Sequence, residues 1–467
     1  MEPNQPVSLV NNQKTGGFPQ AVDPYYGDEG AGGTSRKIIF IILGIVGFIA
    51  FVAAVVFLLS KIFSSGKSSD GTLTYWGIWE DQAVMQPIIE DFERDHPGIK
   101  IKYEKQDIKG LGKYVERLKT RIDKGDGPDI YRFHSSWTMQ LKNHLLAFPR
   151  DLVESTELDK DYYKTVQNDL KLNGGYYGIP LGVDTLALFV NTQLLANVGM
   201  IPPRQWDDIT RSGAPTPLVK EGNTIITSSI ALGTYDNIAH APDILAMLFL
   251  QNGADLENLS GSQKRNAEDT LRFYQLFASG PTSTWNSTLD NSKLAFAKGN
   301  LAMYFGYSWD IFEIKALSPN LDFQVVPVPG LQDIKKTVAS YWVEGVSSKT
   351  KHSEGAFEFM KFISKPETLQ KLYAEQSKIR LFGSLYPRRS MQKLLIDNKL
   401  VFPFVQQADD ARSTFFSSDT HDGDTGMISK MNIYLGNAVR SISETTSPES
   451  AIETLAKGIN QIQSSYK

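Results

Sequence analysis

Residues 71–105 read GTLTYWGIWEDQAVMQPIIEDFERDHPGIKIKYEK, and this stretch decides the fold class. The run TLTYW predicts a β-strand that ends at Gly77. Val84, Ile88 and Phe92 then recur at the spacing of one helix face, which predicts a helix. The final residues, IKIKYEK, alternate apolar and charged side chains as a half-exposed strand does. Strand, helix and strand in this order indicate parallel strands joined by a crossover helix.

The pattern continues for one more unit and then changes. A helix is predicted at 114–122, and GDGPDIYRF at 125–133 is typical of a turn that enters a third strand. Downstream, YYGIPLGVDTLALFV predicts two short strands on either side of a chain crossing at 182–184. Further helices are predicted at 242–252, 263–279, 290–298, 353–377, 390–398, 427–443 and 448–464. Together these elements predict an α/β protein.

The composition of the 467 residues is that of an ordinary globular protein, with 41% hydrophobic and 21% charged residues. One hydrophobic core rarely serves a chain of this length, so we expect two or three folded units. The net charge of −4 gives no sign of the basic face that nucleic-acid binding needs. The chain has no cysteine, which excludes disulfides, Cys-ligated zinc, thiol nucleophiles and a lipid-modified N-terminal cysteine.

Residues 38–59 read IIFIILGIVGFIAFVAAVVFLL and predict one transmembrane helix. A helix of this length spans roughly 33 Å, enough for the hydrocarbon core of a bilayer. A cleaved signal peptide has a shorter apolar core, roughly 7–15 residues, and no A-x-A cleavage site follows here. Residues 1–36 are rich in Gly, Pro, Asn and Gln and are predicted to be disordered, and residues 60–71 are predicted to be a flexible linker.

The charges beside the predicted membrane helix are balanced. Arg36 and Lys37 precede it, and Lys61 and Lys67 follow it. The positive-inside rule therefore barely decides the orientation of the helix.

Six segments in one order carry a family resemblance. They are TLTYWGIWED with FERDHPGIKIKYE, then GDGPDIYRFHSSW, GGYYGIPLGVDTLALFVNTQLL, PRQWDDI, FAKGNLAMYFGYSWDI and SEGAFEFMKFISKPETLQKLY. In this order, and over nearly all of 72–467, the chain resembles extracellular solute-binding proteins of ABC importers, of the sugar-binding, maltose-binding-protein-like kind. The predicted uncleaved anchor departs from the usual secreted or lipid-modified form of that family.

The resemblance implies an α/β fold of the periplasmic-binding-protein type II kind, with two lobes joined by a hinge. The first lobe would comprise 72–182 and 328–378, and the second lobe 185–326 and 379–467. Ligands of open α/β sheets bind outside the carboxyl ends of the strands, which here face the cleft between the lobes. The resemblance also implies a cytoplasmic N-terminus and an extracellular two-lobed domain.

A sugar site needs aromatic platforms for flat C–H faces and charged or amide groups for hydroxyls. Residues of these types follow the predicted strands and crossings. The candidate ligand-binding residues are Trp79, Glu80, Asp81, Ser135, Ser136, Trp137, Asp184, Tyr235, Tyr307, Trp309, Trp342, Glu344 and Arg380. By resemblance, Trp309 stands where the family often carries a sugar-stacking tryptophan. Arg380 lies where the chain departs from the family's common glycine-proline pattern.

Each group of candidates also has a purely structural interpretation. Glu80 and Asp81 are placed to cap the following helix, and the serines after DIYRF are placed to cap the next one. Asp184 suits a turn, and any large aromatic residue such as Trp309 suits the core.

The resemblance implies a receptor that captures a mono- or oligosaccharide by hinge closure and delivers it to ABC permease subunits served by a separate ATPase. No H-E-x-x-H or G-x-S-x-G motif occurs, so we predict no enzymatic activity, no metal and no cofactor. Other interpretations remain open: a tethered ligand sensor, an adhesin, a surface hydrolase, or a receptor for a non-sugar solute such as a polyamine, iron or a phosphate ester.

Overall fold

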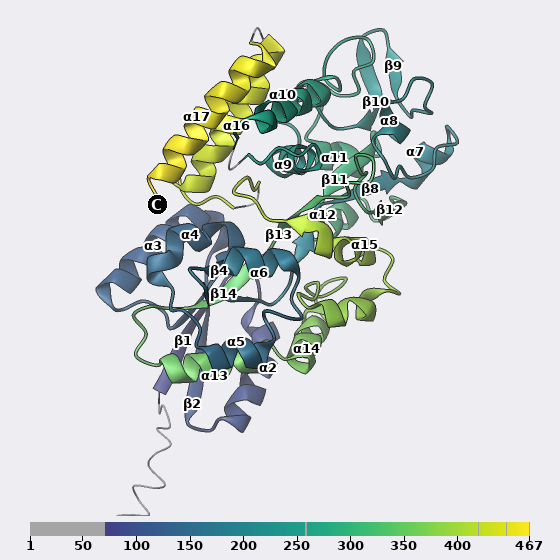
Figure 1. The fold of residues 1–467 in the computed structure, drawn as a ribbon. Coiled ribbons are helices and arrows are strands. Elements are labelled where there is room, and N and C mark those ends of the chain that lie inside the picture. The colour runs from purple at the N-terminus through teal and green to yellow at the C-terminus, as the bar shows by residue number, and fades with distance from the viewer. Residues whose placement is uncertain (1–70, 257–258, 419, 445, 467) are drawn as a thin grey trace, which may run out of the picture. The chain divides into compact units, whose positions relative to one another are not determined.

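The computed structural model describes residues 71–467 apart from 257–258, 419, 445 and 467. The described residues form two lobes, each built on its own five-stranded sheet (Figure 1), as predicted. The predicted tail, the transmembrane helix at 38–59 and the linker up to residue 70 lie outside the described residues. Within 71–467, no described helix is both long enough and apolar enough to cross a membrane.

The sheet of the first lobe has the strand order β2-β1-β3-β14-β6. Its strands are β1 (Gly71–Gly77), β2 (Ile99–Lys105), β3 (Ile130–His134), β14 (Trp342–Val346) and β6 (Ile179–Pro180). β1 pairs in parallel with both β2 and β3, as the sequence pattern predicts. β14, far along the chain, inserts antiparallel between β3 and β6. Gly71, the last residue of the predicted linker, is the first residue of β1.

Helices cover this sheet. They are α2 (Gln82–Asp95), α3 (Leu111–Lys124), α4 (Thr138–Leu141), α5 (Arg150–Thr156), α6 (Lys164–Leu170), α13 (Ser353–Ile363) and α14 (Pro366–Ser377), with the 3-10 turns η1 (Ile108–Gly110), η2 (Ser135–Trp137) and η3 (Lys142–His144) and the small hairpin β4 (Lys171–Leu172) and β5 (Gly175–Tyr176). α2 buries Val84, Ile88 and Phe92, the residues whose spacing predicts it.

The single helix predicted at 353–377 is wrong, because the chain forms two helices there. Lys365 has extended backbone angles, and Pro366 begins α14. A proline disfavours helical geometry in the residue before it and lacks the N–H that a continuous helix needs, but it suits the first helical turn. Pro366 therefore ends one helix and starts another.

The sheet of the second lobe has the order β12-β8-β11-β10-β9. Its strands are β8 (Ala187–Asn191), β9 (Val219–Glu221), β10 (Thr224–Ile230), β11 (Leu301–Gly306) and β12 (Phe323–Val326). Its helices are α7 (Thr192–Ala196), α8 (Asp207–Thr210), α9 (Ala241–Gln251), α10 (Ser262–Gln275), α11 (Ser292–Ala297), α12 (Asp310–Leu317), α16 (Met427–Glu444) and α17 (Pro448–Ser464). β8 and β11 are buried along their whole length, which places them in the lobe's core.

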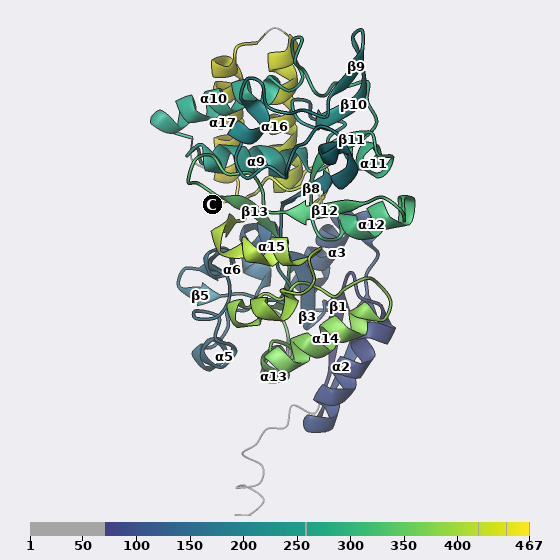
Figure 2. The same cartoon turned by 90° about the vertical axis from the view of Figure 1, so that its right-hand side faces the viewer.

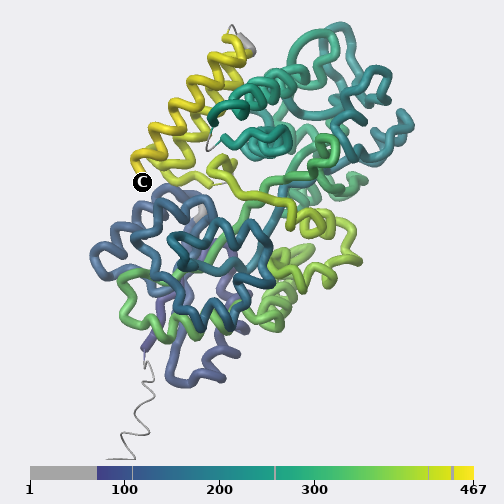
Figure 3. The backbone as a smooth tube through the Cα atoms, viewed as in Figure 1, coloured from purple at the N-terminus to yellow at the C-terminus, as the bar shows by residue number. Residues whose placement is uncertain are grey.

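A three-stranded sheet joins the lobes, in the order β15-β13-β7. Its strands are β7 (Asp184–Thr185), β13 (Thr337–Ser340) and β15 (Ala411–Arg412), and each lies on a different passage of the chain between the lobes. Figure 2 shows β13 between the two lobes, and Figure 3 traces the chain through these passages. The turn η4 (Arg389–Leu395), the helix α15 (Phe402–Gln406) and the turn η5 (Ala408–Asp410) precede β15 in the sequence. The hinge is therefore a hydrogen-bonded unit, not three separate linkers.

The segment after α14 begins against the first lobe. The buried Arg388 donates to the Asp161 carboxylate at 2.8 Å and to the Thr156 carbonyl at 3.0 Å. This part of the predicted second lobe therefore contacts the first, and the predicted lobe boundaries stay predictions.

Candidate functional site

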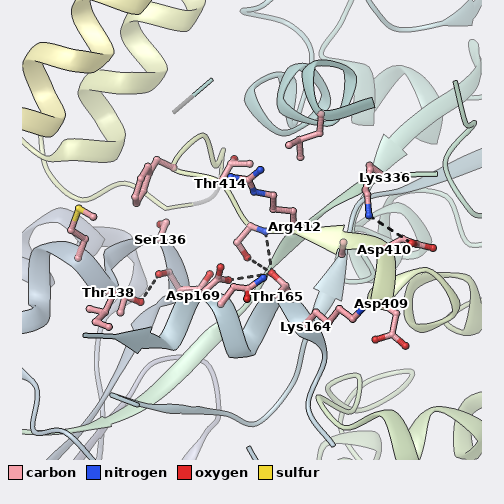
Figure 4. A pocket seen from close by; sticks show the side chains of 18 residues that line it. Ser136, Thr138, Lys164, Thr165, Asp169, Lys336, Asp409, Asp410, Arg412 and Thr414 are labelled. Carbon is pink, nitrogen blue, oxygen red and sulfur yellow. Dashed lines mark hydrogen bonds and ion pairs between the residues drawn. The ribbon is translucent and has the colours of Figure 1, made fainter. Parts of the chain in front are cut away.

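A cavity of about 670 Å³ lies beside the hinge sheet, between the lobes (Figure 4). η2, α4 and α6 of the first lobe line one side of it, and the segment 409–415 lines the other. Leu250 and Lys336 complete the lining from the second-lobe side. The predicted residues Ser135 and Ser136 line this cavity, where the chain leaves β3.

Asp169 provides a carboxylate at the cavity wall. It accepts hydrogen bonds from the Tyr341 hydroxyl at 2.6 Å and from the Thr165 hydroxyl at 3.2 Å. Burial raises the pKa of Asp169, and hydrogen bonds from Ser413, Tyr341 and Thr165 partly offset the rise. Asp169 is not among the residues predicted from the sequence, because a polar residue near the end of an ordinary helix carries no signal of a cavity.

A group of aromatic side chains stands at the strand ends of the first lobe. The Trp342 ring lies 5.4 Å from the Trp79 ring, 5.3 Å from Trp137 and 5.3 Å from His134, all edge to face. Trp79 is 39% exposed and Trp342 is half-buried, whereas Trp137 is fully buried. Of these predicted platforms, Trp79 and Trp342 therefore keep accessible ring surface, and Trp137 supports Trp342 from within the lobe.

A second aromatic pair stands on the second lobe, where β11 ends. Trp309 is the residue before α12, and its ring stacks on that of Tyr307 at 4.3 Å with an interplanar angle of 14°. Tyr307 is buried and donates its hydroxyl to the Asp243 carboxylate at 2.8 Å, whereas Trp309 remains half-buried. The pair resembles a platform, with Tyr307 as its base and Trp309 as its accessible face.

Asp184 ties the hinge to this platform. One carboxylate oxygen accepts from the Thr185 N–H at 2.8 Å, and the other accepts from the N–H of Ser308 at 3.0 Å and from its hydroxyl. Ser340, the β13 partner of Asp184, contacts His134 at 3.0 Å. The bases of both aromatic groups are thus joined through paired hinge strands. As a ligand contact, Asp184 stays a prediction.

The Asp184 carboxyl is expected to make stability depend on pH. Burial raises its pKa to about 7, above the value of about 3.9 for an unfolded aspartate. The unfolded chain therefore loses this proton first, and stability from this group is full below about pH 4 and falls as pH rises towards 7, by up to about 1.4 kcal/mol per pH unit. Urea unfolding at several pH values measures this slope. The variant Asp184→Asn should flatten it, and an equal slope in both proteins would contradict the assignment.

Three predicted residues belong to a buried ionic network instead of an open surface. Arg132, on β3, forms ion pairs with Glu80 and, at 2.5 Å, with its cross-strand neighbour Glu344. Gln376 donates to the free oxygen of Glu80 at 2.8 Å. Arg380 lies close enough to Glu80 to lower its pKa, although it makes no direct bond to it in the described contacts.

The network sets the charge of its carboxyls. Burial acts to raise the pKa of Glu80, but the charges of Arg132 and Arg380, together with hydrogen bonding, outweigh burial and the pKa is lowered. Burial raises the pKa of Glu344 even with Arg132 beside it. Both carboxyls are at least 93% buried in the protein, so their role as ligand contacts stays a prediction.

The remaining predicted residues lie apart. The Asp81 side chain is exposed and pairs with Lys105 at 2.5 Å, and it makes no capping bond to α2. Tyr235 is half-buried, donates to the Asn432 carbonyl at 2.9 Å and lies under the Arg440 guanidinium at 5.4 Å. Neither residue lines the cavity.

Residues 77–370 match the family of bacterial extracellular solute-binding proteins, which is more than half of the chain. The chain belongs to this family. The match agrees with the prediction that the protein binds a solute and is not an enzyme.

Solved structures of solute-binding proteins share the fold. The sugar-binding protein MalE from the phytopathogen Xanthomonas citri is similar with a TM-score of 0.67 and 20% identity, over 85% of this chain and 98% of that one. A cyclo/maltodextrin-binding protein complexed with maltotetraose is similar with a TM-score of 0.65 and 15% identity, over 84% and 98%. These likenesses confirm the predicted two-lobed fold.

Curated sugar-binding proteins are similar to this chain in sequence. The multiple sugar-binding protein of Streptococcus mutans is 25% identical over 355 residues, which is 71% of this chain and 80% of that protein. The arabinooligosaccharide-binding protein of Bacillus subtilis is 29% identical over 160 residues, 32% of this chain and 36% of that protein.

The family does not identify which of its members' ligand contacts this chain retains. In the structure, the described residues 71–467 contain no group of three or more His, Asp or Glu side chains arranged to hold a metal ion. The groups at the hinge are tryptophans, hydroxyls, aspartates and cationic side chains. These are groups that bind a polar organic solute.

Proposed function

We propose that this solute-binding protein is a membrane-anchored extracellular receptor that captures a mono- or oligosaccharide. The observation that carries the proposal is the presence of partly exposed tryptophans on both lobes, Trp79 and Trp342 on one and Trp309 on the other, at strand ends that meet the hinge. Aromatic rings stack on the C–H faces of sugars. The Asp169 carboxylate and the hydroxyls of Ser135 and Ser136 add hydrogen-bonding groups in the neighbouring cavity.

Capture works by closure of the hinge. A solute that touches both lobes stabilises the closed form, because only that form makes both sets of contacts. The names of two curated relatives, a multiple sugar-binding protein and an arabinooligosaccharide-binding protein, support a saccharide as the solute. Delivery then requires ABC permease subunits and a separate ATPase, since this chain has no nucleotide-binding motif.

The apolar residues 38–59 anchor the receptor, with the N-terminus in the cytoplasm and the two lobes outside. Protease treatment of intact cells tests this orientation. The two-lobed domain should be degraded from outside, while an epitope tag at the N-terminus should remain protected until the cells are lysed. Protection of both parts would contradict the orientation.

A thermal-shift panel tests the ligand class. The full chain in detergent is heated with maltotetraose, mannobiose, tagatose and arabinooligosaccharides, and separately with polyamines, ferric citrate and sugar phosphates. A ligand that binds only the native state stabilises it, by about 2.7 kcal/mol when the ligand concentration is a hundred times Kd, and therefore raises Tm. We expect a saccharide to raise Tm. A shift with a polyamine or another non-sugar solute, and with no saccharide, would overturn the sugar proposal.

A further inference from the structure

The two lobes touch directly where α3 meets the loop before α16. Gly112, near the start of α3 in the first lobe, faces the loop that leads into α16 of the second lobe. A Cβ atom on Gly112 would lie 2.6 Å from Gly423 Cα and 2.7 Å from Gly423 N. The ring of His421 would lie 3.1 Å away. The backbones of the lobes are therefore in contact, and no side chain fits between them.

The loop that meets Gly112 is fastened to the second lobe. Asp422 accepts hydrogen bonds from the N–H groups of Ile428 at 2.9 Å and Ser429 at 3.0 Å, which caps the first turn of α16. The same carboxylate accepts from Gln140 of the first lobe at 3.1 Å. A larger residue at position 112 would therefore have to displace this loop, and that would break the hydrogen bonds that cap α16. Figure 1 shows α3 and α4 beneath the lower ends of α16 and α17.

The backbone of α3 does not itself need a glycine at position 112. Gly112 is the second residue of α3 and is absent from the described residues with positive φ. Glycine costs a helix interior about 1 kcal/mol relative to alanine. Within its own lobe, then, alanine would be the more favourable residue, and only the approach of the other lobe requires the glycine.

A second contact joins the lobes through α12. The Phe312 ring lies 4.6 Å from that of Phe382, and the Arg380 guanidinium lies 5.6 Å over Phe312. Arg380 is held by the Phe382 carbonyl at 3.0 Å and by Ser384. α12 begins directly after Trp309, so this contact and the one at Gly112 both bear on how closely the platform approaches the first lobe.

We propose that Gly112 is an affinity-determining residue that binds no solute: its missing side chain lets the lobes reach the fully closed arrangement. The inference rests on the proposed function, in which closure captures the solute. The apparent affinity of a receptor is proportional to the fraction of molecules in the binding-competent state. A side chain at Gly112 thus acts on affinity through closure alone.

Gly112→Ala is expected to weaken binding of the most effective panel saccharide about tenfold or more, measured by calorimetry on the full chain. Its Tm without saccharide should stay the same or rise. Weaker binding without a lower Tm separates a closure role from a structural one. If the glycine were needed only for the fold, its substitution would lower both the stability and the affinity of the protein. Unchanged affinity in Gly112→Ala, with normal binding by the wild type, overturns the inference and leaves the proposed function intact.

Gly110→Ala is the matched control. Gly110 lies two residues earlier, and the only atom within 4 Å of a Cβ placed there is its own neighbour Lys113 at 3.8 Å. This variant should keep wild-type affinity, although loss of the N-cap glycine can lower Tm slightly. An equal loss of affinity in both variants would mean that the α3 terminus, not the contact between lobes, matters.

Spin labels test the geometry without any solute. The chain has no cysteine, so Lys124→Cys and Lys430→Cys place labels only at exposed sites, one on each lobe. We expect the unliganded protein to show a short interlobe distance that Gly112→Ala removes or lengthens. Absence of the short distance in the parent protein, or its persistence in Gly112→Ala, overturns the inference even if no panel saccharide binds.

Discussion

Arg132→Met is expected to lower the free energy of unfolding by about 3–5 kcal/mol, the largest effect of any single substitution considered for stability. The Arg132 side chain is 5% exposed and is paired with Glu80 and Glu344, whose side chains are 6% and 1% exposed. Removal of the Arg132 cation leaves two carboxyls buried beside each other without the ion-pair partner that they share. Urea unfolding followed by circular dichroism measures the loss.

A matched set of variants separates the charge from the packing. Glu80→Gln with Glu344→Gln in the Arg132→Met background removes the stranded charges and should restore much of the lost stability, because a neutral network has less desolvation to overcome. A loss below about 1 kcal/mol in Arg132→Met alone would show that water reaches this network. Equal instability in the single and triple variants would mean that shape, not charge, sets the cost.

Trp309→Ala is expected to weaken saccharide binding about a hundredfold while the unliganded protein keeps its fold. The side chain is half-buried and rests on Tyr307, so its removal leaves the buried base of the platform in place. Truncation of a central aromatic anchor commonly costs 2 kcal/mol or more of binding free energy, about thirtyfold. Calorimetry with the most effective panel saccharide gives the affinity, and circular dichroism confirms the fold.

Trp309→Phe is the conservative control for this prediction. It keeps an aromatic face over Tyr307 and should retain most of the affinity, because stacking needs a ring more than an indole N–H. If Trp309→Ala binds as tightly as the parent protein, then Trp309 is not part of the binding site. If both variants lose affinity equally, the indole N–H, not the ring face, makes the contact.

Local pattern was sufficient for the first strands and helices of the first lobe. The parallel pairing of β1 with β2 and β3 follows from a strand–helix–strand order that the residues between 71 and 133 display openly. α2 buries Val84, Ile88 and Phe92, the residues whose spacing predicts this helix. The break at Pro366 could also be predicted from the sequence, because proline disfavours helical geometry in the residue before it. The prediction of one continuous helix at 353–377 overlooked this local rule.

The candidate site was only partly predictable. Trp79 and Trp309 follow strands and remain accessible, as residues placed just beyond a strand end tend to be. Ser135 and Ser136 line the cavity for the same reason. Asp169 was missed, since the cavity it faces is closed by residues 409–415, about 240 positions later in the chain.

The order of apolar and polar residues along this chain determined most of its strands and helices, because these elements depend on neighbours within a few turns. Six segments in a fixed order indicated the solute-binding family. The partners of its charged side chains were decided by tertiary structure. Glu80 and Glu344 both pair with Arg132, because β14 enters the sheet beside β3 from 212 positions away. Burial and pairing between distant segments set the charge and reach of a carboxylate, and a linear sequence carries no local trace of either.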